Sequence, residues 1–366
     1  MISMEGIASA WTNTRSTALR RLFLDRQAEF WMGELDPVRS MDEIRARVVE
    51  LVEETEDTKT FVLQPNTAWP GHRAGQYTSI EVEIDGVRAR RCYSISSAPG
   101  EALVSITVKR VSGGRVSSWL HEEVRTGEIV RLGAATGDFV LPTPTPAKIL
   151  LLSGGSGITP VMSMLRDLAA RDAIHDLVFV YYARSRADVI FGEELADLAA
   201  GHAGLRLVLC LDDEASAPRG FDEARFAKLV PDFAERSTFL CGPGPLMDRV
   251  EQLWEGAGAS DLLERERFAP APTLAPVLAP TKEVQLRLAR SERDVVAGGA
   301  GTLLEQLERA GERPANGCRM GICHSCKCRK YSGTVHNLVT GKVSSEPDQE
   351  IQLCISVPRS DLELDL

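Results

Sequence analysis

Residues 317–326 read Gly-Cys-Arg-Met-Gly-Ile-Cys-His-Ser-Cys, so four and then two residues separate Cys318, Cys323 and Cys326. Cys354 follows after twenty-seven further residues. This spacing is typical of four thiolates that converge on a two-iron cluster, three from one tight loop and one from a distant segment. A structural zinc site, the alternative, favours two short Cys-x-x-Cys pairs. The sequence therefore predicts a [2Fe–2S] cluster.

The segments around these cysteines, residues 302–311 and 356–362, resemble a ferredoxin domain, and the resemblance covers residues 282–366. It implies an α+β fold of the β-grasp type, in which a mixed sheet packs on one helix. We expect that helix at residues 303–309. Cys328 has no counterpart among the ligands of that family, and we interpret it as a spectator thiol rather than an alternative ligand.

The composition is that of an ordinary soluble chain, since 43% of the 366 residues are hydrophobic and 6% are aromatic. The length predicts two or three domains. The net charge of −10 argues against a nucleic-acid partner. No apolar run approaches the roughly 18 residues of a transmembrane helix. Eight cysteines, four of them assigned to a cluster, indicate a reducing compartment. We expect a cytoplasmic monomer.

Two segments match no catalytic motif. Residues 269–280 contain four prolines among small residues, which predicts a semi-extended tether in front of the ferredoxin domain. In the first forty residues, Leu19, Leu22, Phe23 and Phe30 could form one face of a helix. We interpret that helix as packing on its own protein, with docking at a membrane surface as the alternative.

A glycine loop begins the middle of the chain. An apolar strand at residues 148–152 leads into Ser-Gly-Gly-Ser-Gly-Ile-Thr-Pro at residues 153–160, and an amphipathic stretch follows. Strand, glycine loop and helix in this order form a pyrophosphate cradle, although such loops also serve merely for packing. We expect Thr159 as the N-cap and Pro160 as the first helical residue. The predicted ligands are Gly154, Gly155, Gly157, Thr159 and Pro160.

Further strands and helices alternate after this loop, which predicts a doubly wound parallel α/β sheet. The last strand ends in Cys241-Gly242-Pro243, which resembles the Cys-Gly-Pro turn of the ferredoxin-NADP reductase superfamily. The resemblance implies that Cys241 lies beside the nicotinamide ring. The expected strands are residues 177–182, 205–211 and 238–241, and the expected helices are residues 191–200, 222–229 and 245–257.

The end of the second nucleotide strand carries Arg184 and Arg186. Arginine suits a 2′-phosphate, whereas a carboxylate suits the 2′-hydroxyl of NADH. We therefore expect NADPH rather than NADH. The alternative is that both are solvated loop arginines and that Asp212 and Asp213 serve NADH.

Six β-rich segments between Ile44 and Pro142 alternate with turn residues and predict an antiparallel β-barrel. One of them contains Arg91-Cys92-Tyr93-Ser94, which resembles the Arg-x-Tyr-Ser flavin motif of the same superfamily. Alternation along a strand places Arg91 and Tyr93 on one face, so the cation can meet a flavin phosphate while the ring lies against isoalloxazine. The resemblance places Ser94 near flavin N5. The expected strands are residues 47–52, 58–63, 76–84, 88–95, 103–111 and 129–133.

Residues 108–121 resemble the strand, glycine turn and helix start that hold the FAD pyrophosphate in flavohemoglobin-type reductases. Backbone N–H groups at a helix N-terminus suit such an anion. FMN is the alternative, because dioxygenase reductases with the same domain order use it, but the run Val-Ser-Ser-Trp-Leu-His favours FAD. The candidate ligands are Val108, Lys109, Gly114, Val116, Ser117 and Ser118.

Together these motifs resemble one-chain reductases that pass electrons to oxygenases, hydroxylases and fatty-acid desaturases. Flavin must connect the other two centres, because nicotinamide gives two electrons at once and a cluster accepts one. The resemblance implies a catalytic group of Tyr93, Ser94, Cys241 and Glu266, although the residues before Glu266 depart from the usual histidine-containing form. The predicted domains are a helical extension (1–40), an FAD-binding β-barrel (41–143), an NAD(P)-binding α/β domain (144–268), a linker (269–281) and a ferredoxin domain (282–366).

These motifs do not identify the terminal electron acceptor. A membrane desaturase as partner would give a peripheral membrane location. One rival function is the reduction of small molecules such as quinones without a protein partner. The other is a redox-sensing module whose cluster signals through protein contacts.

Overall fold

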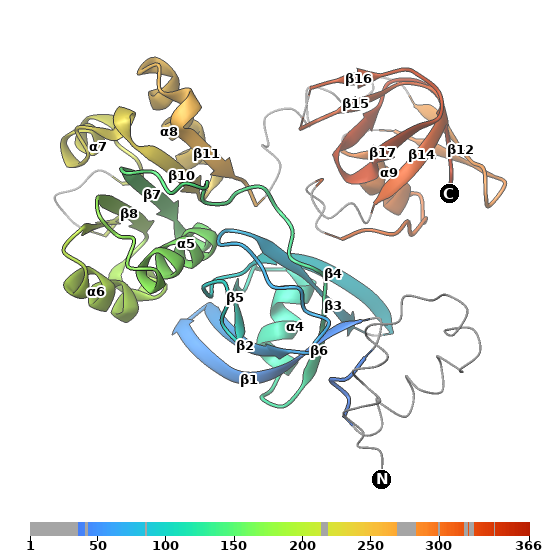
Figure 1. Ribbon diagram of the computed structural model, residues 1–366. Helices are drawn as coiled ribbons and strands as arrows, with labels where there is room; N and C mark the ends of the chain where they lie inside the picture. Colours follow the sequence, from blue (N-terminus) through green and yellow to red (C-terminus); the bar gives the residue numbers. More distant parts are fainter. Residues whose placement is uncertain are drawn as a thin grey trace, which may run out of the picture.

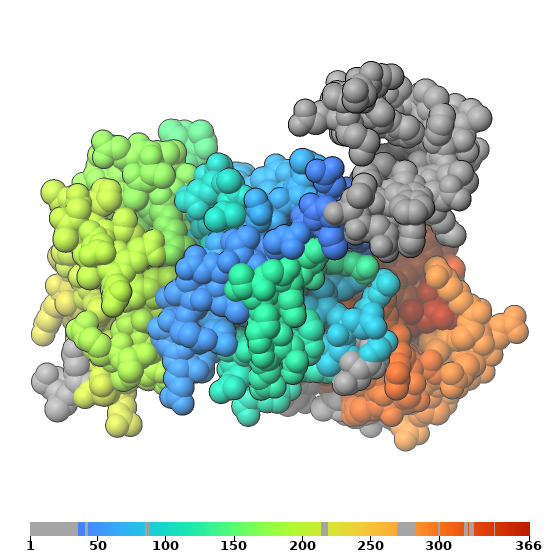
Figure 2. All heavy atoms as spheres, turned by 90° about the horizontal axis from the view of Figure 1, so that it is seen from below, coloured from blue at the N-terminus to red at the C-terminus, as the bar shows by residue number. Residues whose placement is uncertain are grey.

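The computed structural model describes residues 36–40, 43–84, 86–213, 219–268, 283–298, 301–317, 321, 326–339 and 341–366. The predicted linker and residues 1–35 of the predicted extension lie outside these ranges. The described chain forms three modules, and Figures 1 and 2 show the first of them between the other two. Among the described residues, no helix is long and apolar enough to cross a membrane.

The first module is a six-stranded sheet in which every pair of neighbours is antiparallel, in the order β4-β3-β6-β1-β2-β5. An isolated bridge between Ile95 and Ile106 brings the end of β4 back to β5. Helix α4 (Arg115–Glu123) packs Val116 and Leu120 into the core of this sheet. The strands are β1 (Ile44–Thr55), β2 (Thr58–Pro65), β3 (Tyr77–Ile84), β4 (Val87–Ser94), β5 (Val104–Lys109) and β6 (Ile129–Leu132). All six predicted strands are confirmed.

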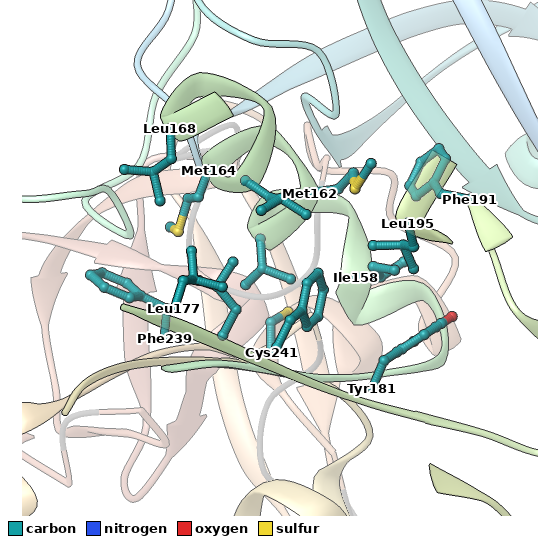
Figure 3. Packing of buried hydrophobic residues seen from close by; sticks show 14 of the residues in the cluster. Ile158, Met162, Met164, Leu168, Leu177, Tyr181, Phe191, Leu195, Phe239 and Cys241 are labelled. Carbon is teal, nitrogen blue, oxygen red and sulfur yellow. The ribbon is translucent and has the colours of Figure 1, made fainter. Parts of the chain in front are cut away.

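The second module is a five-stranded parallel sheet in the order β11-β10-β7-β8-β9, which confirms the doubly wound prediction. The order reverses between β7 and β10, where such sheets bind their ligands. One apolar cluster, shown in Figure 3, includes residues of α5 and α6, and a second includes residues of α7 and α8. The elements are β7 (Ile149–Gly154), α5 (Ile158–Ala170), β8 (Leu177–Ala183), α6 (Gly192–Gly201), β9 (Leu205–Leu211), α7 (Glu223–Leu229), β10 (Ser237–Cys241), α8 (Gly244–Gly256) and β11 (Leu263–Glu266).

The predicted start of α5 is wrong. The helix begins at Ile158 and its N-cap is Gly157, not Thr159. A 3₁₀ turn at Gly155–Gly157 continues directly into the helix, so Thr159 and Pro160 already lie inside its first turn. The Thr159 hydroxyl instead donates to the Ser156 carbonyl, 3.1 Å away.

The third module contains a five-stranded sheet, β13-β12-β19-β14-β17, and a small sheet, β16-β15-β18. Strand β12 is parallel to β19, and the other pairs are antiparallel. The predicted helix is confirmed as α9 (Leu303–Arg309), which begins at a capping box formed by Thr302 and Glu305. The strands are β12 (Val284–Leu288), β13 (Arg293–Ala297), β14 (Lys327–Ser332), β15 (Val335–Asn337), β16 (Val343–Ser344), β17 (Gln349–Gln352), β18 (Ser356–Pro358) and β19 (Leu362–Leu364).

Candidate functional site

The glycine loop and the Cys-Gly-Pro turn meet at the point where the strand order reverses. Cys241 of β10 pairs with Ser153 of β7 in the parallel register. A Cβ atom on Gly157 would lie 2.2 Å from the Cys241 carbonyl oxygen, and one on Gly154 would lie 2.9 Å from Cδ of Pro243. Only glycine permits this approach. The two predicted motifs therefore form one cradle.

This cradle fits a dinucleotide. Gly155 has φ of +52°, and a Cβ atom there would meet nothing within 4 Å. Ser153 is fully buried, and its hydroxyl has no hydrogen-bond partner among the described residues. The open loop lies in front of α5, whose backbone N–H groups and positive dipole end favour an anion.

The predicted catalytic side chains Ser94, Cys241 and Glu266 come together across two modules. Glu266 of β11 is the register partner of Cys241. The Ser94 hydroxyl at the end of β4 lies 3.5 Å from Oε2 of Glu266 and donates a long hydrogen bond to it. The group thus joins the first module to the second.

The surroundings of these groups determine their ionisation. Burial raises the pKa of the Glu266 carboxyl to about 7, and the bond from Ser94 opposes that rise. Burial raises the pKa of the Cys241 thiol well above its usual value. Cys241 is fully buried in the apolar cluster shown in Figure 3, which includes Ile158 and Phe239. Cys241 is therefore a neutral thiol, whereas Glu266 can gain or lose a proton near neutral pH.

Strand β4 also contacts the third module. Nη1 of Arg91 donates to the carbonyl oxygens of Arg90, at 2.8 Å, and of Gly317, at 2.9 Å. Gly317 directly precedes Cys318. Tyr93, two residues further along β4, is partly buried, and burial raises the pKa of its hydroxyl. The strand that carries the predicted flavin motif thus touches the segment that leads into the predicted cluster loop.

The first turn of α4 leaves backbone N–H groups without a side-chain cap, which fits the predicted pyrophosphate site. No side chain caps its N-terminus at Gly114, where a Cβ atom would lie 2.6 Å from Oγ of Ser117. That hydroxyl accepts from the Val111 amide and donates to the Gly114 carbonyl, each at 3.2 Å. The turn is thereby held open toward solvent at Gly113, with φ of +72°. Ser118 and Val116 lie in the first helical turn, as expected.

Two further predicted flavin ligands lie at the end of β5. Val108 is fully buried, and its carbonyl oxygen accepts a 2.7 Å bond from the ring of His121, so its side chain belongs to the core. The Lys109 ammonium lies 2.8 Å from Asp57. Burial alone raises the pKa of Asp57, but bonds from Lys109 and Thr58 lower it to about 2. Lys109 is thus engaged with a carboxylate in this structure.

The two predicted 2′-phosphate arginines both lie at the surface. Arg184 is exposed and forms ion pairs with Asp188 and, at 3.4 Å, with Asp57 of the first module. Arg186 is exposed in the short 3₁₀ turn after β8. Asp212, the alternative partner for a ribose hydroxyl, accepts from the Gly220 amide at 2.7 Å. To bind the 2′-phosphate of NADPH, Arg184 would have to break its ion pairs with Asp188 and Asp57.

The cluster segment fits a thiolate-ligated group. Sγ of Cys326 lies 3.2 Å from Sγ of Cys354, and the Gly321 amide donates to that second sulfur, also at 3.2 Å. Gly321 has φ of +78°, and a Cβ atom there would lie 2.7 Å from Ile355. Two of the four predicted ligands therefore converge under a backbone N–H group. The other two, Cys318 and Cys323, lie outside the described residues.

Cys328, interpreted as a spectator, is buried on β14. Burial raises the pKa of its thiol to about 11, and the thiol donates to the Arg329 carbonyl. A protonated thiol in this position is a poor metal ligand.

Two residues that help to join the first two modules were not predicted from the sequence. Ser163 and Arg166, both on α5, donate to the carbonyl oxygens of Ser97 and Ser96, which follow the flavin motif. A serine and an arginine on a helix whose other residues are mostly buried and apolar are the signal that could have identified them.

The comparisons with known proteins match this organisation. The description "Oxidoreductase FAD-binding domain" matches residues 45–141, "Oxidoreductase NAD-binding domain" matches residues 151–252, and "2Fe-2S iron-sulfur cluster binding domain" matches residues 286–359. These segments coincide with the first, second and third modules. The predicted cofactors, FAD, NAD(P)H and a [2Fe–2S] cluster, are confirmed at this level.

Similar proteins share nearly the full length of the chain. An NADPH oxidoreductase of Mycobacterium tuberculosis is 41% identical, covering 90% of this chain and 86% of the relative. A glycine betaine monooxygenase reductase subunit of Pseudomonas aeruginosa is 35% identical, covering 87% and 94%. The solved structure of phthalate dioxygenase reductase superposes with a TM-score of 0.63 at 26% identity, covering 89% and 98%. The chain belongs to the ferredoxin reductase-type oxidoreductases that combine FAD-binding, NAD-binding and 2Fe-2S domains in one polypeptide.

Proposed function

We propose that this oxidoreductase carries electrons from NADPH to an oxygenase component, with the cluster as the exit. The observation that carries the proposal is the position of β4. Its Ser94 contacts Glu266 of the second module, and its Arg91 contacts Gly317 of the third. The flavin strand thus touches both the nucleotide side and the cluster side, in the order that the electrons must follow.

When bound, FAD supplies the conversion between the two-electron chemistry of nicotinamide and the one-electron chemistry of the cluster. The protein's own residues position the reactants. Tyr93 and Arg91 offer a ring and a cation on one face of β4, and the start of α4 offers backbone N–H groups to the pyrophosphate. The glycine loop and the Cys241 turn hold the dinucleotide. Positioning of this kind provides most of the rate enhancement.

Glu266 and Ser94 have a role in proton handling. With a pKa of about 7, the Glu266 carboxyl can hold or release a proton near neutral pH, and the Ser94 hydroxyl lies 3.5 Å from its Oε2. Cys241 stays neutral because it is buried, and it excludes water from the same point. We therefore assign Tyr93, Ser94, Cys241 and Glu266 to the catalytic group.

NADPH is the proposed donor because Arg184 and Arg186 follow β8. The name of the mycobacterial relative, NADPH oxidoreductase, supports this assignment. The ion pairs of Arg184 with Asp188 and Asp57 are at the surface and therefore weak, so a 2′-phosphate can replace them.

The finer architecture is also part of the proposal. We interpret the first module as a β-barrel, since the Ile95–Ile106 bridge joins its edge strands, and the third as a β-grasp fold. The domain boundaries proposed above, the linker and the four cysteine ligands of the cluster belong to the same interpretation. The names of relatives support an oxygenase as the partner. A membrane desaturase, a peripheral membrane location and a monomeric state are further hypotheses.

The test is reconstitution with the purified protein under anaerobic conditions. We expect one FAD and two irons per chain, and reduction of the flavin by NADPH. Replacement of Cys354 by Ser should remove the cluster and electron delivery to an oxygenase component, while NADPH still reduces the flavin. If electron delivery were retained without a cluster, the cluster would not be the exit for electrons. The flavin would then serve acceptors directly, which would favour the reduction of small molecules such as quinones.

A further inference from the structure

We propose that Arg166 is a positioning residue for hydride transfer, because it fastens the segment after the flavin motif to the helix that follows the glycine loop. The inference rests on the proposed nucleotide and flavin sites. The group of Arg166, Ser163, Glu194, Phe191 and Glu54 is called the interface clamp.

The guanidinium of Arg166 is held on three sides. Its Nη1 donates to the Ser96 carbonyl oxygen of the first module at 2.6 Å. Its Nε and Nη2 form a bidentate pair with the Glu194 carboxylate of α6, the first at 2.7 Å. Its Cζ lies 4.7 Å from the centre of the Phe191 ring. The side chain of Arg166 is 19% exposed and that of Glu194 is 40% exposed, and the bidentate geometry fixes the direction of the guanidinium.

A second contact lies one helical turn away. The Ser163 hydroxyl, which is fully buried, donates to the Ser97 carbonyl at 2.6 Å. Helix α5 therefore holds two successive carbonyl groups of the first module. Ser96 and Ser97 are both buried, so neither carbonyl contact is readily replaced by water.

The clamp is closed from the other side by Glu54 of β1. Its Oε2 accepts from the Phe191 amide at 3.2 Å, and its Oε1 accepts from the Thr60 hydroxyl at 2.7 Å. Hydroxyl contacts then run from Thr60 to Thr107 and from Thr107 to Ser96. Ser96, whose carbonyl binds Arg166, is thus connected through hydroxyl groups to Glu54, which binds the Phe191 amide.

This arrangement lies between the two halves of the reaction site. Ser96 is two residues after Ser94, and Arg166 is on the same helix whose N-cap, Gly157, contacts the Cys241 carbonyl. A shift of α5 against the segment 95–97 would change the distance between a nicotinamide beside Cys241 and a flavin beside Ser94. Misplacement by about 1 Å can lower a rate about a hundredfold. The clamp therefore sets a distance without touching the reactants.

The experiment uses the full-length holoprotein and the variants Arg166→Met, Arg166→Lys and Glu194→Gln. Arg171→Met is the control, since Arg171 ends the same helix and pairs with Asp167 at the surface. Two quantities are measured: the stopped-flow rate of flavin reduction at saturating NADPH, and hydrogen–deuterium exchange of a peptide covering residues 94–99.

We expect Arg166→Met to lower the saturated rate by about tenfold or more, with flavin content and apparent NADPH affinity little changed. Arg166→Lys and Glu194→Gln should give intermediate rates. Hydrogen–deuterium exchange in residues 94–99 should rise most in Arg166→Met and less in Arg166→Lys and Glu194→Gln. Arg171→Met should alter neither the rate nor the exchange.

A normal saturated rate in Arg166→Met would overturn the proposal. If that variant does not fold, normal saturated rates in both Arg166→Lys and Glu194→Gln would overturn the proposal. A loss of rate that follows flavin loss, with unchanged exchange, would show a purely structural role and also overturn it. Hydrogen–deuterium exchange and flavin content are measured separately from turnover. If only the assigned electron donor or acceptor were wrong, the Arg166 variants would still show raised exchange, and the rate would still fall when the true donor reduces the flavin.

Discussion

Glu266 is the residue whose protonation the structure predicts most sharply. Burial raises its pKa from 4.5 to about 7, so the folded chain keeps this proton at pH values where the unfolded chain has lost it. The contribution of Glu266 to the free energy of unfolding therefore falls as the pH rises from about 4.5 to about 7, and stays low above that range. One unit of pKa shift corresponds to about 1.4 kcal/mol.

We predict that Glu266→Gln stabilises the protein at pH 8 by about 1–3 kcal/mol and has little effect near pH 4.5. The same variant should flatten the dependence of flavin reduction on pH around 7. Chemical denaturation at the two pH values measures the first effect, with Glu264→Gln, exposed on the same strand, as control. An equal effect of Glu266→Gln at both pH values would contradict the assignment.

Arg184 and Arg186 determine a second prediction at this scale. Changing both to Ala removes the cations that would bind the 2′-phosphate, so the preference for NADPH over NADH should fall. The expected decrease is about tenfold and not larger, because both arginines are exposed and solvent weakens their contacts with phosphate. The ratio of kcat/KM for the two nucleotides measures it. Arg206→Ala, exposed on β9, is the control and should leave the ratio unchanged. An unmodified protein with equal efficiency for both nucleotides would refute the assignment.

At the scale of elements, the contact between the glycine loop and the end of β10 is the tightest constraint of the second module. A methyl group on Gly157 would lie 2.2 Å from the Cys241 carbonyl and 2.7 Å from Cα of Gly242, so the backbone itself must shift. Overpacking of this kind costs about 1–3 kcal/mol. The shift would separate the two motifs that form the dinucleotide cradle.

We therefore predict that Gly157→Ala lowers the unfolding free energy by about 1–3 kcal/mol and raises the KM for NADPH. The matched control is Gly201→Ala at the end of α6, where a Cβ atom would meet nothing within 4 Å. That change should be neutral or slightly stabilising, since alanine is the better helix former. Similar KM values in the two variants would argue against a nucleotide role for the loop.

At the scale of the whole molecule, the order of the modules separates a complete reductase from a complete ferredoxin. We predict that a chain ending at Phe268 still folds and reduces ferricyanide with NADPH. Its reduction of cytochrome c should fall steeply, because transfer to an attached cluster at high effective concentration becomes a bimolecular encounter. Restoring the separate segment 283–366 at high concentration should recover part of the activity. Unchanged cytochrome c reduction at dilute protein would show that the cluster is not the exit.

Motifs of adjacent residues were predictable because their chemistry is local. The spacing of Cys318, Cys323 and Cys326, the pair Arg91 and Tyr93 on alternate positions of a strand, and the glycine loop each depend on neighbours within about ten residues. The helix at Leu303–Arg309 was predicted from the resemblance of residues 302–311 to a ferredoxin domain, and its capping box lies within four consecutive residues. The strand alternations of the first two modules followed from hydrophobic pattern and turn residues.

The sequence by itself therefore determined the cofactor classes and the order of the modules, whereas tertiary structure decided how the modules meet. Ser94 and Glu266 are 172 positions apart, and Arg91 and Gly317 are 226 apart. Such contacts depend on the docking of whole surfaces, which no local pattern encodes. The helix N-cap moved from Thr159 to Gly157 for a related reason: the loop closes against the Cys241 carbonyl of another strand, and that packing selects where the helix begins.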